Sequence, residues 1–158
     1  MGLSAEYRAH FRALRELSGL SREEIAQAIS VTPQTIDQWC SGIIIPKEEG
    51  MRFLIQKDEE LSEIASEVCD QIAEMVEDRG EEPHHIVVHS YHHNETYDES
   101  PLWDKTDLTF GQHWELQKRL YCLLNHEGYD VLVGESTGDD GEEHHVSVVF
   151  TFDDIIYI

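Results

Sequence analysis

The stretch Ser21–Gly42, which reads SREEIAQAISVTPQTIDQWCSG, carries the start and stop signals of two short helices. Ser21 and Glu24 have the spacing of a capping box, in which each side chain accepts a hydrogen bond from the other residue's backbone N–H. Thr32 followed by Pro33 marks a second helix start, because proline at the first helical position sacrifices no helical hydrogen bond. Gly42 is a stop signal for that helix. We therefore expect two short helices joined by a tight turn.

Apolar residues within and before this stretch recur at helical spacing. A preceding helix is predicted from about Ser4 to Ser18, and Gly19 ends it. The residues predicted to share one core are Phe11, Leu14, Leu17, Ile25, Ala26, Ile29, Ile36 and Trp39. Three helices around one small core are thus expected at the start of the chain.

These residues together resemble the Cro/C1-type, or XRE-type, helix-turn-helix superfamily, whose fold is lambda repressor-like. The resemblance covers about residues 8–57. It rests on Leu14-Arg15, Gly19-Leu20-Ser21, Glu24-Ile25-Ala26, Val31-Thr32, Thr35-Ile36, Trp39, Gly42 and Pro46. One departure is Ser30, which stands where the family commonly has glycine in the turn between the helices. The resemblance implies a DNA-binding domain over residues 1–57, with its last helix in the major groove.

The outward positions of the last short helix carry side chains suited to reading bases. Gln34, Thr35 and Gln38 face away from the predicted core, and the resemblance places base contacts there. Glutamine pairs with adenine N6 and N7, and threonine offers a hydroxyl or a methyl group to thymine. By the same resemblance, phosphate contacts are expected from Arg22, Thr32 and Lys47. Asp37 lies beside this face and would repel phosphate or accept from cytosine N4.

The formal net charge of −22 is distributed very unevenly. Residues 1–57 hold seven basic and seven acidic side chains, whereas the remaining 101 residues hold 26 acids and four bases. A polyanion such as DNA tolerates a neutral face with local positive charges but is repelled by an acidic one. The charge pattern therefore separates a DNA-reading part from an acidic part with another task.

The rest of the chain predicts an α+β arrangement. A long acidic helix is expected from about Lys47 to Asp78, with interruptions at Gly50 or near Asp58 left open, so that residues 58–83 form a connecting helix and linker. Residues 84–158 are expected to form a small β-α-β-β module for dimerisation or sensing. Its elements are a strand near 86–91, a helix over 109–125, and a β-hairpin of strands 129–134 and 145–152 around residues 138–141. The apolar stripe of the acidic helix must pack on this module or on a second copy.

Histidines are concentrated in this second half. His85, His89 and His93 would share one face of a regular strand and are weak candidates for zinc or nickel ligands. Exposed or partly buried histidines that respond to pH are the preferred interpretation, so no metal and no other cofactor is predicted.

Three functions remain open at this point. The first is a dimeric, sequence-specific transcriptional regulator that binds operator DNA. The second is an acidic interaction module, antitoxin-like or imitating nucleic acid, that binds a basic protein. The third is a metal-responsive module. No nucleophile with a neighbouring base and no glycine-rich phosphate loop occurs, so we do not expect an enzyme. A cytoplasmic, membrane-free location is expected because no apolar run approaches the length of a membrane span.

Overall fold

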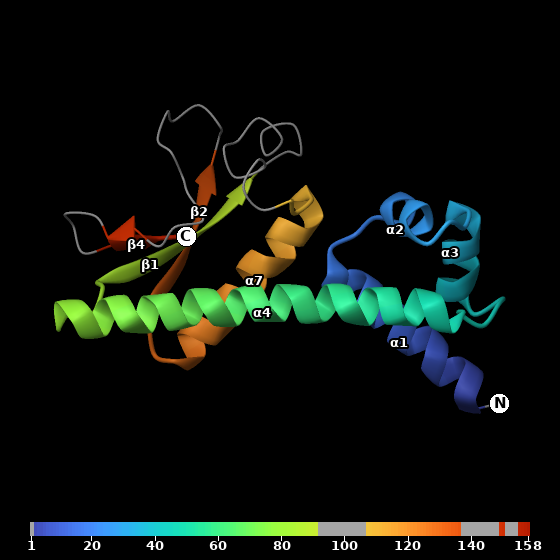
Figure 1. The fold of residues 1–158 in the computed structure, drawn as a ribbon, viewed down its shortest axis with the longest axis horizontal. Helices are drawn as coiled ribbons and strands as arrows, with labels where there is room; N and C mark the ends of the chain where they lie inside the picture. Colours follow the sequence, from blue (N-terminus) through green and yellow to red (C-terminus); the bar gives the residue numbers. More distant parts are fainter. Residues whose placement is uncertain (1, 92–106, 137–148, 151–154) are drawn as a thin grey trace. The chain divides into compact units, whose positions relative to one another are not determined.

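The computed structural model describes residues 2–91, 107–136, 149–150 and 155–158, and Figure 1 shows their helices and strands. The chain divides into two compact units, residues 1–61 and 62–158. One helix, α4 (Glu48–Arg79), begins in the first unit and ends in the second.

The first unit contains α1 (Gly2–Ser18), α2 (Arg22–Ala28), α3 (Pro33–Ser41) and the beginning of α4. The predicted capping box is present, since Ser21 Oγ accepts from the Glu24 backbone N–H at 3.2 Å and the Ser21 N–H donates to Glu24 Oε2 at 2.7 Å. Thr32 Oγ1 caps α3 in the same way by accepting from the Thr35 N–H. Local sequence therefore determines where α2 and α3 begin.

The core of this unit draws side chains from all four helices. The rings of Phe11 and Trp39 meet edge to face, with centroids 5.4 Å apart. Leu17 was predicted to be buried but is 45% exposed. The inward stripe of α1 continues from Leu14 to Ser18, four residues on, and Ser18 is fully buried. The buried core residues are Phe11, Leu14, Ile25, Ala26, Ile36, Trp39, Met51 and Leu54.

The turn between α2 and α3 contains a residue in left-handed backbone conformation. Ser30 has a φ of 56°, a region that residues with a Cβ adopt at a cost of about 1–2 kcal/mol. Ser30 therefore adopts the backbone conformation that glycine would adopt at a lower energetic cost.

α4 is one continuous helix, without a break at Gly50 or Asp58. Its apolar stripe is already covered within a single chain, because Leu61, Ala65, Val68 and Ile72 are all buried. Of the two expectations for this stripe, a second copy is therefore not needed.

Among the residues described in the second unit, four strands form one sheet in the order β2-β1-β4-β3. Its strands are β1 (His85–Tyr91), β2 (Val131–Ser136), β3 (Val149–Phe150) and β4 (Ile155–Tyr157). β1 runs parallel to both β2 and β4, with Ile86 opposite Val131 and Ile156, and β3 is antiparallel to β4. α7 (Phe110–His126) lies between β1 and β2 in the chain and contacts both strands.

The predicted hairpin of strands 129–134 and 145–152 is wrong. β2 and β3 are at opposite ends of the described strand order, and β4, which sequence reasoning missed, is the partner of β3. Parallel pairing of β1 and β2 requires a crossover connection, and α7 supplies it. The predicted turn at residues 138–141 lies outside the described residues. The fold class is nevertheless α+β, as predicted.

Candidate nucleic-acid interface

The outer face of α3 presents both glutamines. Gln34 is exposed and Gln38, one turn later, is half-exposed, while Ile36 and Trp39 on the opposite side are buried in the core. The two buried side chains fix the rotation of α3 about its axis, because turning the helix would expose Trp39. The face predicted to read bases is therefore directed outward by core packing.

Thr32 and Thr35 form a linked pair at the start of this helix. Their hydroxyl oxygens are 2.9 Å apart, and Thr32 Oγ1 also accepts from the Thr35 backbone N–H. A hydroxyl has one proton to donate. If Thr35 donates to Thr32, the Thr32 proton can be given to a phosphate, and Thr35 still offers its methyl group and an acceptor oxygen. One hydroxyl orientation therefore serves both predicted roles.

Arg22 is held by two carboxylates. Its guanidinium donates to Glu23 Oε1 at 2.6 Å and to Asp37 Oδ2 at 2.7 Å, thereby linking α2 to α3. These hydrogen bonds, with Glu23 the larger contributor, raise the pKa of Arg22, and the bond from Arg22 lowers the pKa of Glu23. The negative charge of Asp37 beside the reading face is thus offset by a neighbouring cation. Arg22 can reach a phosphate only by sharing its donors with these acids.

Lys47 is exposed and directly follows the buried Pro46. It borders a surface hollow together with Ala28 and Arg52, so it lies near the end of α2. All six predicted contact residues therefore lie in the first unit. They are Arg22, Thr32, Gln34, Thr35, Gln38 and Lys47.

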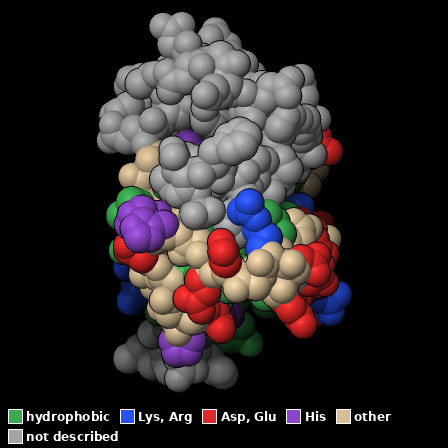
Figure 2. Space-filling view, turned by 90° about the vertical axis from the view of Figure 1, so that its left-hand side faces the viewer, with side chains coloured by type: hydrophobic (Ala, Val, Ile, Leu, Met, Phe, Trp, Pro, Cys, Tyr) green, Lys and Arg blue, Asp and Glu red, His purple; other side chains and the backbone are tan. Residues whose placement is uncertain are grey.

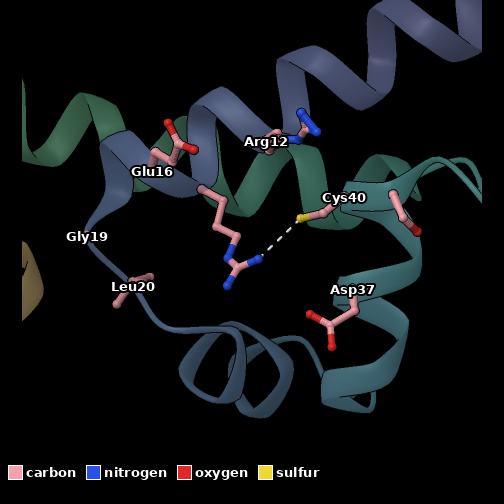
Figure 3. Close-up of a pocket in the computed structure, with 8 residues that line it drawn as sticks. Arg12, Glu16, Gly19, Leu20, Asp37 and Cys40 are labelled. Atoms are coloured by element: carbon pink, nitrogen blue, oxygen red, sulfur yellow. Dashed lines mark hydrogen bonds between the residues drawn. The ribbon is translucent and has the colours of Figure 1, made fainter.

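Sequence reasoning missed the arginines of α1. Arg12 and Arg15 line a cavity of about 590 Å³ together with Glu16, Asp37 and Cys40 (Figure 3). Arg15 Nη1 donates to Cys40 Sγ at 3.4 Å, which is the dashed line in Figure 3. The spacing of arginines along α1 was the available signal, since residues three and four apart share a helix face.

The candidate metal ligands in β1 have different partners. His85 Nδ1 donates to Asp130 Oδ2 at 2.7 Å, and His89 Nδ1 donates to the backbone oxygen of Ile158 at 2.9 Å. His93 lies outside the described residues. Within the part of the chain that is described, no three His, Cys, Asp or Glu side chains form a group able to hold a metal ion.

A buried polar cluster joins α7 to the sheet instead. His113 is only 2% exposed, and Gln117 Nε2 donates to His113 Nε2 at 3.2 Å and weakly to the Ile158 backbone oxygen at 3.5 Å. Burial, and secondarily the charge of His89, lower the pKa of His113 to about 4. We therefore expect this cluster to make the second unit sensitive to acid.

Acidic side chains form most of the charged surface of the described residues on the face in Figure 2. Among the described residues, no helix combines the length and the apolar character needed to cross a membrane.

Two short helices joined by a tight turn, the second of which (α3) presents glutamines outward, define the helix-turn-helix class of DNA-binding domains. Residues 11–51 match the model of the Helix-turn-helix family, of the XRE type, as the residue pattern predicted. No curated protein matches the chain. The match supports a DNA-binding transcription regulator of this type.

Proposed function

We propose that this protein is a sequence-specific transcriptional regulator that binds its operator as a dimer. The observation that carries this proposal is the outward presentation of Gln34 and Gln38 on α3, with Ile36 and Trp39 buried behind them. Glutamine side chains at these positions can make paired hydrogen bonds to adenine in a major groove. Thr35 adds a methyl contact to thymine, while Arg22, Thr32 and Lys47 contact phosphates.

Dimerisation follows from the weakness of one reading unit. Residues 1–57 have no net charge, so counterion release adds little affinity, and two half-sites are needed for tight binding. We assign the dimer contact to residues 84–158. In support, β2 is an end strand of the sheet among the described residues, a position that can pair with another chain, and its Leu132 and Val133 are about half exposed.

The test is a binding selection on duplexes with a random central segment, using the full chain. We expect one enriched motif with two related half-sites about one helical turn apart. Gln34→Ala with Gln38→Ala should abolish the enrichment, whereas Gln71→Ala, an exposed glutamine on α4, should leave it intact. An unchanged motif in the double variant would refute the assignment of these residues. Sedimentation of the protein with and without the enriched duplex measures the dimer.

The acidic second unit supports a second function, the binding of a basic protein. Residues 62–158 hold 23 acids and four bases. Such a surface attracts a cationic partner with strong salt dependence. This function predicts that a basic protein bound to residues 62–158 is recovered at low salt and lost at high salt, and that no duplex is enriched. A single enriched motif combined with salt-independent recovery would refute it.

A further inference from the structure

Three arginines lie along one side of α1 at positions 8, 12 and 15, and two of them, Arg8 and Arg15, contact the last turn of α3. Arg8 Nη1 donates to the backbone oxygen of Ser41 at 3.4 Å, and Arg15 Nη1 donates to Cys40 Sγ at 3.4 Å. Arg12 lines the same cavity as Cys40 and Ser41 (Figure 3). We call Arg8, Arg12 and Arg15 the arginine edge.

The charges of the arginine edge are not balanced by ion pairs. Among the described residues, no carboxylate lies within ion-pair distance of these three guanidinium groups, whereas Arg22, Arg52 and Lys57 each pair with an acid. A backbone oxygen or a thiol accepts one hydrogen bond but carries no full negative charge. Each guanidinium has five N–H donors, so most of them are available to a ligand.

Three acids near these arginines must be counted. Asp37 and Glu23 are both engaged by Arg22, although Glu23 also feels the charge of Arg15, and Glu16 is exposed. With Arg8 added, the arginines exceed the uncommitted acids around the last turn of α3.

Arg8 links the arginine edge to the outward face of α3 through Ser41, whereas Arg15 contacts Cys40, four residues after the buried Ile36. Ser41 follows Gln38 by three residues and Gln34 by seven, so these three positions share one helix face. Arg8 is packed closely there, because a Cβ added to Gly42 would lie 2.5 Å from Arg8 Cδ. A duplex that receives α3 in its major groove therefore brings a phosphate strand close to these arginines.

We propose that Arg8, Arg12 and Arg15 contact the DNA phosphate backbone that borders the groove occupied by α3. The inference rests on the proposed function, because it requires α3 to enter the groove. Arginine matches phosphate through paired hydrogen bonds, and a unit without net charge depends on its unpaired cations for counterion release. The arginine edge then supplies sequence-independent affinity, while the glutamines supply specificity.

The experiment measures binding of the full chain to a random-sequence duplex of about 30 base pairs and to the enriched duplex over a range of salt concentrations. Arg12→Gln should lower the slope of log K against log salt by about 0.9 and lower K about eightfold at roughly 0.1 M salt, equally on both duplexes. Arg79→Gln is the matched control, since Arg79 is the last residue of α4 and belongs to the second unit. It should leave the slope unchanged.

The alternative role of the arginine edge is structural, because cations at a helix C-terminus stabilise its dipole. In that case Arg8→Gln and Arg15→Gln would lower the melting temperature while the salt slope stayed the same, which would overturn the proposal. An Arg12→Gln slope equal to that of the parent would overturn it as well. Because the random duplex does not depend on base reading, a selection without enrichment would refute the operator proposal and leave this measurement valid.

Discussion

Lowering the pH from 7 to 4 is expected to destabilise the second unit through His113. This imidazole is buried between α7 and the sheet, and its pKa is lowered to about 4 from an ordinary value of 6.5. The unfolded chain therefore binds a proton at pH values where the folded unit does not. Stability contributed by the neutral imidazole is complete above pH 6.5 and is lost as the pH falls towards 4.

The size of the effect follows from the two pKa values. Each pKa unit corresponds to about 1.4 kcal/mol, so the gap between 6.5 and about 4 amounts to roughly 3 kcal/mol of unfolding free energy. That is a large fraction of the unfolding free energy of a whole domain, which is typically about 5–15 kcal/mol. Below pH 4 both states are protonated at this site, and the loss from His113 stops.

The assay is urea unfolding at several pH values between 7 and 4, followed by the amide NMR signals of α7. The parent is compared with His113→Leu, which cannot titrate, and with His126→Gln, which removes an exposed imidazole from the same helix. Between pH 7 and pH 4, the unfolding free energy of the parent should fall by about 3 kcal/mol more than that of His113→Leu. The His126→Gln comparison should show no such change.

Two results would refute the reasoning. One is a His113 imidazole NMR signal that titrates near pH 6.5 in the folded protein, since burial would then cost the cation nothing. The other is an equal pH dependence in the parent and in His113→Leu. Either would mean that water or another group solvates the imidazolium inside the second unit.

Three further perturbations test the first unit. Ser30→Gly should stabilise it by about 1 kcal/mol in thermal unfolding, because glycine adopts the observed φ of 56° without strain; a lower melting temperature would contradict this. Gly50→Ala should destabilise it by about 1–3 kcal/mol despite alanine's helix propensity, because the new Cβ would lie 2.6 Å from Trp39 Cζ3; unchanged urea unfolding would show that Trp39 moves freely. Asp37→Asn should tighten binding to a random duplex up to about eightfold at low salt, because it removes a negative charge and releases Arg22. Unchanged binding would place Arg22 away from the phosphates.

Features that depend on a few neighbouring residues were predictable. The capping box of Ser21 and Glu24, the Thr32 cap and the left-handed Gly42 each involve backbone and side-chain groups within four residues. The outward direction of Gln34 also follows from local periodicity, because buried positions three and four residues apart define the opposite face. For such features the chain carries both partners of the interaction in one short segment.

Features that depend on distant residues were not predictable in this way. Arg22 and Asp37 are fifteen residues apart, and nothing local indicates that the acid beside the reading face is neutralised. Arg8 contacts Ser41, which is thirty-three residues away in the sequence. The sequence showed that the arginines share a helix face but not which residues they contact. The turn-rich residues 138–141 equally favoured a hairpin, although β2 pairs with β1 instead.

By itself, the sequence determined that this chain begins with a helix-turn-helix and continues into an acidic α+β part. The spacing of hydrophobic residues and the capping of helix ends depend on residues within one or two turns, so neighbouring residues in the sequence reveal them. The tertiary structure alone decided that the stripe of α4 is buried within one chain, that β1 and β2 are parallel, and that His113 is enclosed. These outcomes depend on which long-range packing excludes the most water, and a local pattern is compatible with several such packings.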